Sequence, residues 1–505
     1  MKIKGNERSA QERKEMEVEH QGLPKKQKSL KLNFIMNAFL TMSNFIFPLI
    51  TFPYVSRVLL PLGTGKVAFA TSIVTYFSMF AQLGIPTYGI RACAQVRDKK
   101  EELSRVTQEL LLVNLAMTVI SYAAFAMMLI TIPKIRAEKT LFLVMSSMIL
   151  LNSLGMEWLY KALEEYTYIT IRSVFFKILS IGAMFLLVKT PEHYVRYGAI
   201  SILASSASNL FNFIYAHKFI SLRPVYAYNF KRHIQPVLIF FAMSCATTIY
   251  TNLDTVMLGM MKSEEDVGFY NAAVKIKNVL VSVITSLGTV ILPRVSYYVE
   301  HQMQEEFLRT AKKAVWFVWV CALPLMVYFI MFAREGIYFL SGTAYQNSVF
   351  PMQLLMPTLL FIGLTNIMGI QIMVPLGKEN LVLRSVCLGA LVDLLINAWL
   401  IPKYASIGAA IGTLAAEFVV LCYQYWEIKR MKLVIFERLN YKVYVVALVL
   451  AVLAVLWVKH WSGGVFATLC ISSVLFFSVY AFILLLAKEP LLYELYRKYL
   501  NRQNL

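Results

Sequence analysis

A carboxylate interrupts the apolar segment that ends in YTNLDTVMLG, residues 250–259, where Asp254 is the charged residue. A lysine, Lys275, interrupts the next apolar segment. If the two segments form a helical hairpin, both charges lie roughly 13–18 Å from its tip at a rise of about 1.5 Å per residue. Charges inside membrane-spanning helices are costly and commonly mark a transport pathway. We therefore expect Asp254 to hold the ammonium group of Lys275 at mid-depth in a membrane.

Other cations are candidates for binding an anionic group. Lys277 follows Lys275 by two residues, which is roughly 200° around a helix, so both cannot face one cleft squarely, and the spacing leaves open which one does. Lys177 also falls near the middle of its apolar segment, 168–189. Arg57 lies at the outer end of the first apolar segment, 32–59. These four cations would compensate anionic charge where water cannot reach. The candidates for charge pairing or gating are Asp254, Asn252 and Arg91.

A second acidic pair lies late in the chain. Asp393 and Glu417 flank a short turn at Pro402 and Lys403, and their depths differ by roughly 6 Å. Two carboxylates at similar depth could share a proton or hold a sodium ion, because both cannot ionise cheaply in a low dielectric. They are therefore candidates for ion coupling. The alternative, two unrelated polar residues that are each satisfied by a neighbouring helix, stays open.

Composition assigns the chain to a membrane class. Of its 505 residues 58% are hydrophobic and only 15% are charged, whereas a soluble globular domain carries about a quarter charged residues. Apolar segments of roughly 20 residues recur, each about long enough to cross a bilayer core of about 30 Å. The sequence therefore predicts an all-α polytopic membrane protein with about 14 transmembrane helices. The predicted spans are 32–59, 66–90, 106–132, 140–160, 168–189, 197–217, 234–260, 267–293, 312–333, 350–375, 381–400, 406–427, 441–459 and 465–487.

Basic residues are distributed unevenly between the predicted loops. With the N-terminus inside, the inner loops and the two tails hold about 35 of the 49 Lys and Arg residues, and the outer loops hold about 10. This asymmetry follows the positive-inside rule, so the net charge of +20 indicates topology rather than nucleic-acid binding. Both termini are predicted to be cytoplasmic. Residues 1–31 are expected to be a disordered tail, and the C-terminal PLLYELYRKYL an amphipathic helix on the inner surface.

Signatures of catalysis and of cofactor binding are missing from the sequence. The outer loops are short, roughly ten residues or fewer, and could not house the site of a glycosyltransferase or polymerase. PLGTGKVA (61–68) lacks the glycine and the hydroxyl residue that a phosphate-binding loop requires at Leu60 and Val67. The six cysteines are scattered without a CxxC pair, so neither a metal cluster nor a disulfide framework is expected. We expect a protein that is not an enzyme and has no cofactor.

An internal echo divides the chain. VAFATSIV (67–74) aligns with VGFYNAAV (267–274), and further on Arg91 aligns with Arg294. Both echoes occupy the second span of a six-span half, which predicts a parallel repeat about an axis normal to the membrane. The expected organisation is an N-lobe of helices 1–6 at 32–220, a C-lobe of helices 7–12 at 221–430, and two appended helices with a tail at 431–505.

Four segments together resemble the bacterial polysaccharide repeat-unit flippases, which carry units of O-antigen, capsule or exopolysaccharide. They are FPLITFPYVSRVL (47–59), YGIRACAQVRDKKEEL (88–103), EWLYKALEEYTYITIRS (157–173) and NLDTVMLG…VGFYNAAVKIKN (252–278). These flippases belong to the multidrug, oligosaccharidyl-lipid and polysaccharide exporter superfamily. The resemblance implies two six-helix lobes within fourteen helices. It also implies a substrate, an oligosaccharide linked through pyrophosphate to undecaprenol, which alternating access moves from the inner to the outer leaflet of the cytoplasmic membrane.

Several other functions are alternatives to a repeat-unit flippase. An ion-coupled multidrug or cation antiporter of the same superfamily should have an acidic cleft, whereas here the midplane cations at least match the acids. A lipid II flippase would differ only in headgroup. A facilitator-type sugar transporter should carry a GxxxDRxGRR-like signature between its second and third spans, which GIRACAQVRDKKEEL does not fit. The expected partners are the lipid-linked oligosaccharide, the bilayer and a polysaccharide polymerase; the coupling ion, H⁺ or Na⁺, is left undecided.

Overall fold

The computed structural model of the chain describes residues 30–221, 223–224, 228–436, 441–461 and 463–489. These residues form helices and contain no strand. Within them, twelve helices are long and apolar enough to cross a membrane, or thirteen if one bent pair counts as a single span. The predicted all-α polytopic class is confirmed, whereas the count of about 14 stays a prediction. The expected tail at 1–31 falls almost entirely outside the described residues, as does the expected amphipathic helix PLLYELYRKYL.

The first two predicted spans are joined in one long element, α2 (Leu30–Gln82), of 53 residues. A straight helix of that length would extend roughly 80 Å at about 1.5 Å per residue, more than twice the thickness of a bilayer core, but this element is bent at Leu60 and consists of two helices. Leu60 has φ 60° and ψ 177°, which is non-helical, and Pro61 follows it. At the other end, positive φ at Leu83 and Gly84 stops the helix before α3 (Ile85–Gln95). The predicted span 66–90 is therefore broken at Leu83 and Gly84 and continues as α3 to Gln95.

The rest of the first half consists of helices that run back and forth between two ends. We call the end with the start of α2 and α3 the predicted inner end, and the end with Leu60 and α5 the predicted outer end. The helices are α4 (Lys100–Thr131), α5 (Pro133–Ala137), α6 (Lys139–Leu154), α7 (Glu157–Ala162), α8 (Tyr166–Leu187), α9 (Tyr194–Ile202), the π-helical turn η2 (Leu203–Ala207) and α10 (Asn209–Tyr215).

The second half of the chain is also built of helices. Its helices are α11 (Lys231–Met261), α12 (Glu264–Glu300), α13 (Gln304–Met331), α14 (Ala333–Ser341), α15 (Val349–Leu355), α16 (Thr358–Thr365), the π-helical η5 (Asn366–Met373), α17 (Glu379–Tyr404) and α18 (Ser406–Arg430), followed by α19 (Tyr441–Val455) and α20 (Val465–Leu486).

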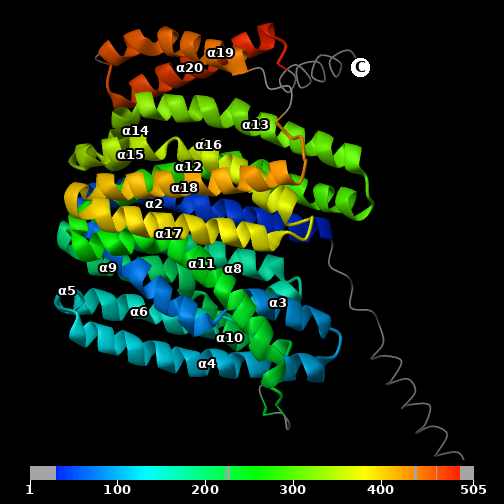
Figure 1. Cartoon of the computed structure of the whole chain (residues 1–505). Helices are drawn as coiled ribbons and strands as arrows, with labels where there is room; N and C mark the ends of the chain where they lie inside the picture. Colours follow the sequence, from blue (N-terminus) through cyan, green and yellow to red (C-terminus); the bar gives the residue numbers. More distant parts are fainter. Residues whose placement is uncertain (1–29, 222, 225–227, 437–440, 462, 490–505) are drawn as a thin grey trace, which may run out of the picture.

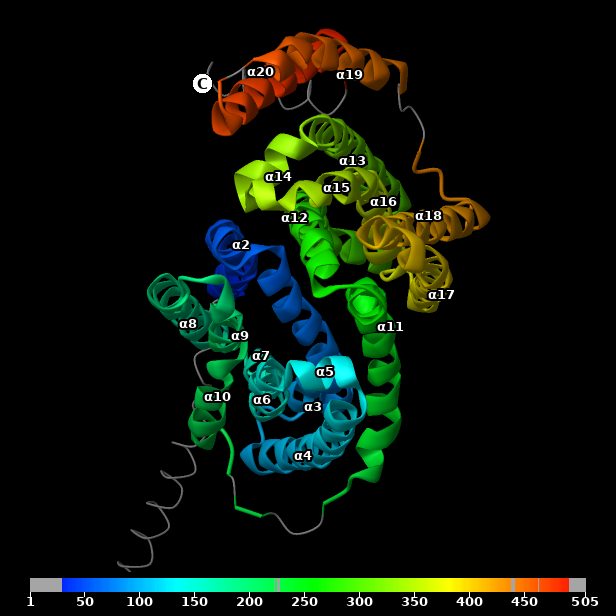
Figure 2. The same cartoon turned by 90° about the vertical axis from the view of Figure 1, so that its left-hand side faces the viewer.

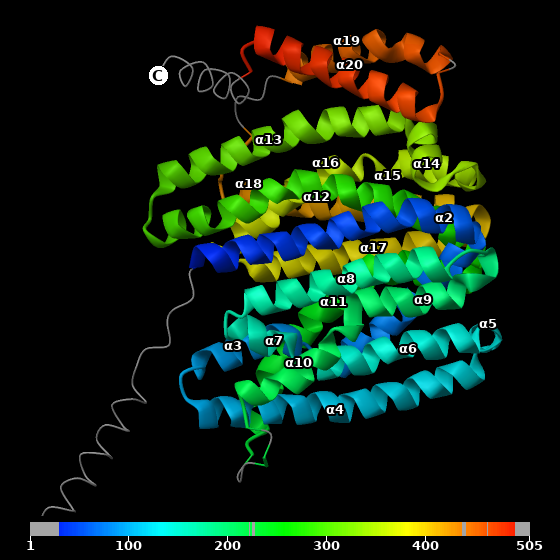
Figure 3. The same ribbon diagram turned by 180° about the vertical axis from the view of Figure 1, so that it is seen from behind.

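Most of the helices lie side by side along one direction (Figures 1 and 3), as expected for a bundle whose backbone must be satisfied within lipid. Seen along that direction, α4 to α10 gather in one group, α12 to α18 gather in another, and α11 reaches from the first group to the second (Figure 2). The pair α19 and α20 lies beside α13, where the Tyr328 hydroxyl donates to the carbonyl of Leu469 at 3.0 Å. The division into lobes at 32–220, 221–430 and 431–505 stays a prediction.

Candidate functional site

Asp254 lies where four helices of the second half converge. Its side chain, 6% exposed on α11, accepts hydrogen bonds from three neutral donors. These are the Tyr270 hydroxyl of α12 at 2.5 Å, the Asn397 amide of α17 at 2.6 Å and the Thr413 hydroxyl of α18 at 2.8 Å. Among the described residues there is no ion pair with Lys275. The predicted partner of Asp254 was therefore wrong.

The two predicted acidic clusters form one group in space. Asp393, 2% exposed, precedes Asn397 by one turn of α17, and Glu417 follows Thr413 by one turn of α18. Asp393 is close enough to interact electrostatically with Asp254 and Glu417. Within the described part of the chain, one of its carboxylate oxygens has no hydrogen-bond partner. Three buried carboxylates thus gather in one place, which we call the acidic cluster: Asp254, Asp393 and Glu417.

The cation that faces the acidic cluster is Lys277, which interacts with both Asp393 and Glu417. Lys275, two residues earlier on α12, points elsewhere, as its position around the helix requires. Its ammonium lies 4.0 Å from the centroid of the Phe52 ring of α2, a cation–π contact with the first half of the chain. The tertiary packing therefore separates the two lysines that the sequence could not distinguish.

A glycine makes room for the acidic cluster. A Cβ at Gly412 of α18 would lie 2.1 Å from the amide oxygen of Asn397 and 2.9 Å from a carboxylate oxygen of Asp393. Sequence reasoning missed Tyr270, Asn397 and Thr413. Two of them carry a signal that could have been used, because Asn397 and Thr413 are each one helical turn from an acid and so share its face.

Arg57 joins the two halves of the chain at the predicted outer end. Its guanidinium donates to the carbonyls of Tyr338, Phe339 and Leu340 at 3.4, 2.5 and 3.3 Å, and to that of Pro53 at 2.6 Å. The first three are at the C-terminus of α14, where carbonyls lack helical partners and the helix dipole favours a cation. Arg57 is thus placed at the rim, away from the acidic cluster.

Glycines allow the halves to meet closely beside Arg57. A Cβ at Gly65 would lie 1.7 Å from the carbonyl oxygen of Glu264, and one at Gly268 would lie 2.0 Å from that of Pro61. Gly65 lies just before the first segment of the internal echo, 67–74. Gly268 lies within the second segment, 267–274. Lys134 adds an ion pair with Glu264 at 3.7 Å. We call this set of contacts, together with those of Arg57, the outer closure.

Lys177 occupies a different place, within the first half. Its ammonium donates to the Ser43 hydroxyl at 2.7 Å and to the Asn44 amide oxygen at 2.5 Å, both on α2. It lines a cavity of about 380 Å³ between α2, α8 and η2. The structure therefore does not gather Arg57, Lys177 and Lys275 into one cluster.

The remaining two predicted residues do not contact Asp254. The amide of Asn252 donates to the carbonyl of Thr248 at 3.1 Å and to the hydroxyl of Thr251 at 3.0 Å, both on its own helix. Arg91 is exposed on α3 at the predicted inner end. No contact in the described part of the chain links either of them to charge pairing with Asp254.

An ionic network that the sequence did not predict joins α4 to the start of α11. Glu109, fully buried, accepts from Arg232 at 2.6 and 3.1 Å, from His233 at 2.7 Å and from the backbone amide of Asn229 at 2.6 Å. The Tyr88 hydroxyl of α3 lies 2.8 Å from the other ring nitrogen of His233. The first turn of α11 is therefore fastened to the first half at the predicted inner end.

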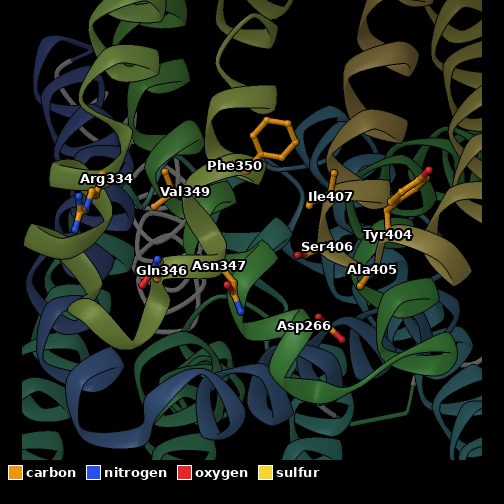
Figure 4. Close-up of a pocket in the computed structure, with 10 residues that line it drawn as sticks. All are labelled: Asp266, Arg334, Gln346, Asn347, Val349, Phe350, Tyr404, Ala405, Ser406 and Ile407. Carbon is orange, nitrogen blue, oxygen red and sulfur yellow. The ribbon is translucent and has the colours of Figure 1, made fainter.

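A surface pocket opens on the second half at the predicted outer end (Figure 4). It has a volume of about 550 Å³ and combines exposed aromatic rings with polar groups. None of the predicted site residues lines it. The lining residues are Asp266, Arg334, Gln346, Asn347, Val349, Phe350, Tyr404, Ala405, Ser406 and Ile407.

Comparison with known proteins adds the family to this geometry. Residues 30–299, more than half of the chain, match the family described as polysaccharide biosynthesis protein. The chain belongs to the polysaccharide biosynthesis protein family. Residues 240–399, which include Asp254 and Asp393, also match the family named MatE. Membership confirms the predicted family.

Individual relatives of this polysaccharide biosynthesis protein agree with the assignment. Two are named "Putative O-antigen transporter": one from Escherichia coli K12, 23% identical over 81% of this chain and 98% of its own, and one from Shigella dysenteriae, 24% identical over 79% and 100%. A solved structure, the lipid II flippase MurJ in an inward closed conformation, superposes with a TM-score of 0.70 at 16% identity, covering 89% of this chain and 98% of its own. That likeness shows a shared fold.

Proposed function

We propose that this chain is a flippase that moves undecaprenyl-pyrophosphate-linked oligosaccharide repeat units from the inner to the outer leaflet of a bacterial cytoplasmic membrane. Membership of the polysaccharide biosynthesis protein family supports the pathway. The relatives named as O-antigen transporters support the kind of cargo, and the fold shared with a lipid II flippase supports the mode of transport. In this proposal both termini are cytoplasmic, and the released glycan passes to a polymerase.

The outer closure is the observation that carries the mechanism. It joins the proposed N-lobe, 32–220, to the proposed C-lobe, 221–430, through hydrogen bonds and close glycine contacts, without a covalent link. Water can replace each of these hydrogen bonds at a net cost of about 1 kcal/mol. Rocking of the lobes breaks the outer closure and opens the outer side, which is the alternating-access cycle of a transporter with two repeats.

Lys275 is the proposed ligand of the anionic headgroup. It lies at mid-depth and contacts an aromatic ring, and no carboxylate within 4 Å pairs with it among the described residues. A pyrophosphate would compensate this charge while the polyprenyl tail stays in lipid. Arg57 would act at the rim, as a lock of the outer closure. Lys277 is reassigned to balance the acidic cluster.

The acidic cluster is the proposed site of ion coupling. A proton or a sodium ion bound between Asp254 and Asp393 would relieve the repulsion of two buried carboxylates. Asn397 and Thr413 supply neutral oxygens next to these carboxylates, as a sodium site needs. Binding or release of the ion would change how α11 packs against α17 and α18. The same cluster favours the alternative function, an ion-coupled cation antiporter, because the match to MatE covers two of its three acids.

Transport of a labelled glycolipid tests the proposal. The purified full-length protein is reconstituted into liposomes that contain an undecaprenyl-pyrophosphate-linked oligosaccharide on the inner leaflet only. Exposure of the sugar to a membrane-impermeant glycosidase is then followed with and without proton and sodium gradients. We expect protein-dependent exposure that Lys275→Ala slows at least about tenfold, because the half-buried cation supplies a charge-assisted contact.

The control variant is Lys429→Gln, which removes an exposed cation at the end of α18 and should transport normally. Gradient-driven movement of a cationic dye without any movement of the glycolipid would overturn the flippase proposal and leave the antiporter. Glycolipid movement that Lys275→Ala does not affect would remove Lys275 from the pathway and leave the flippase proposal standing.

A further inference from the structure

The cavity beside Lys177 has the features of a ligand site of its own. We call it the Lys177 crevice. One wall is a polar stripe on α2, formed by Asn37, Thr41 and Asn44 at the spacing of one helix face, and the opposite wall is formed by Ser173 and Lys177, one turn apart on α8. The side of the crevice is closed by the π-helical turn η2, a type of distortion that often occurs at functional sites.

The two polar stripes face each other across open space. Helices in a membrane associate by close packing and by direct hydrogen bonds between polar side chains. Here Lys177 bonds to α2 at the deep end and the Thr170 hydroxyl donates to the carbonyl of Met36 at 3.0 Å, and between these links lies a cavity of about 380 Å³. That is roughly the volume of a dozen waters, enough for a phosphate group with its hydroxyl contacts. The outward faces of both helices are apolar, as at Phe39 and Phe175, and suit a lipid tail.

Among the described residues no carboxylate lies within 4 Å of the Lys177 ammonium to form an ion pair. The side chain is 8% exposed and both of its hydrogen-bond acceptors, on Ser43 and Asn44, are neutral. The carboxylate that lines the crevice, Glu157, is already bound by Lys161 at 2.8 Å and lies 3.8 Å from a second cation, Arg172.

The crevice therefore has an excess of positive charge. A buried cation with neutral partners is expensive unless an anion joins it.

The position of the crevice indicates how a ligand reaches it. Glu157 and Lys161 are on α7 at the predicted inner end, whereas Lys177 is roughly 16 Å further along α8, counted from Tyr166. A headgroup coming from the inner leaflet would meet Lys161 first and Lys177 last. Lys275, by contrast, is on α12 in the second half and contacts α2 at Phe52, further along that helix than Asn44.

We propose that the Lys177 crevice binds the phosphate group of a lipid taken from the predicted inner leaflet. The ammonium of Lys177 pairs with the phosphate, and the hydroxyl of Ser173 and the amide of Asn37 donate hydrogen bonds to it. The Thr41 hydroxyl, which donates to the carbonyl of Asn37 at 2.9 Å, can turn to the phosphate when the lipid binds. The lipid is either the pyrophosphate-linked carrier, in which case the crevice is a loading site that deepens the proposed function, or an anionic glycerophospholipid. The shared chemistry is a phosphoester on an apolar tail.

Replacing Asn44 by aspartate gives the sharpest test. Asn44→Asp keeps the shape and the hydrogen bond to Lys177 but adds a carboxylate, so the crevice is neutralised from within. Purified full-length protein in phosphatidylcholine nanodiscs is titrated with undecaprenyl pyrophosphate in one arm and with phosphatidylglycerol in the other. Bound lipid is counted by native mass spectrometry. We expect at least about tenfold weaker binding in Asn44→Asp, the effect of losing one charge-assisted contact.

Two matched variants isolate the charge. Lys177→Arg keeps the cation and should bind lipid within about threefold of the unmodified protein, and Lys429→Gln should bind as the unmodified protein does. A purely structural lysine predicts that Asn44→Asp is harmless, since it supplies a stronger partner. Equal binding by Asn44→Asp and the unmodified protein in both arms would therefore overturn the proposal, provided that both elute as monodisperse folded protein.

The arms separate this inference from the proposed function. If Asn44→Asp loses binding of undecaprenyl pyrophosphate only, the crevice is a loading site, and the same variant should also transport the glycolipid more slowly. Loss confined to phosphatidylglycerol supports a site for bulk anionic lipid. Binding that depends on Lys177 in a protein that transports no glycolipid would support the crevice and refute the flippase.

Discussion

Gly268 should control how tightly the outer ends of the two halves can close. It lies on α12 against Pro61 of α2, and the carbonyl oxygen of Pro61 occupies the space that a side chain would need. The partner is backbone, which cannot rotate away as a flexible side chain can. Gly268→Ala therefore forces α2 and α12 apart wherever the outer closure forms, and leaves the outward-open state free of that clash.

The size of the effect follows from the contact distance. The added Cβ would lie 2.0 Å from the Pro61 oxygen, so the helices must separate by more than about 1 Å to reach ordinary van der Waals contact. Overpacking of this kind costs about 1–3 kcal/mol. At about 1.4 kcal/mol per factor of ten, the equilibrium shifts roughly 5- to 150-fold towards the open state.

The shift from the closed to the open state can be measured as the accessibility of position 64, which lies near the contact of Gly268 with Pro61. Thr64 is buried on α2, where its hydroxyl lies 2.7 Å from that of Tyr345 in the second half. A cysteine at position 64, in a chain whose six native cysteines are replaced, should react slowly with a membrane-impermeant maleimide while the closure holds. Because labelling then follows the open fraction, Gly268→Ala should speed it by the same 5- to 150-fold.

A second glycine provides the control. Gly182 is also within a helix, α8, and a Cβ there meets no atom within 4 Å. Gly182→Ala should leave the labelling rate unchanged, although it removes the same backbone freedom. If Gly268→Ala labels no faster than Gly182→Ala while both proteins remain folded, the close contact does not belong to a reversible closure and the reasoning fails.

Three other substitutions test the remaining contacts. Arg57→Ala removes the hydrogen bonds to the end of α14. Because exposed hydrogen bonds from a charged group together contribute about 1–2 kcal/mol, labelling at position 64 should become about tenfold faster. An unchanged labelling rate would show that Arg57 does not stabilise the outer closure. Asp254→Asn removes the negative charge that would bind a proton or cation, and its amide group cannot accept the hydrogen bonds of Tyr270 and Thr413 as the carboxylate does. Gradient-driven transport should therefore fall at least about tenfold. Full transport by this variant would contradict ion coupling at Asp254. Glu109→Gln removes the charge that Arg232 and His233 contact and should lower the free energy of unfolding by about 1–3 kcal/mol, measured as a lower thermal midpoint. Glu101→Gln, a change at an exposed residue of the same helix, should leave the midpoint unchanged. Equal midpoints for the two variants would show that the ionic network of Glu109 does not stabilise the fold.

Much of the architecture is encoded locally in the sequence. Hydrophobic length decides which segments can cross a bilayer, and the cost of unsatisfied backbone in lipid makes those segments helices. The boundary at Leu83 and Gly84 differs from the prediction because a positive φ at Gly84 ends the helix there, and glycine permits this conformation without being recognisable as a stop inside an apolar run.

The sequence also located the charged residues of the site without revealing their partners. It placed Asp254 and the two lysines at mid-depth, and it placed Asp393 and Glu417 at a common depth. Counting residues from a turn gives the position of a side chain along the membrane normal and nothing about its direction in the membrane plane. The pairing of Asp254 with Lys275 rested on depth alone and was wrong for that reason.

What only the tertiary structure decided is which helices are neighbours. Packing of α11 against α12, α17 and α18 supplies Asp254 with Tyr270, Asn397 and Thr413, and turns Lys277 rather than Lys275 towards the acids. Neutral polar residues recur along many membrane helices, so no local pattern marks these three as ligands. Composition and length fix each helix by itself, because backbone hydrogen bonds close within a helix, whereas a buried charge is satisfied by side chains far apart in sequence and therefore only once the helices have packed.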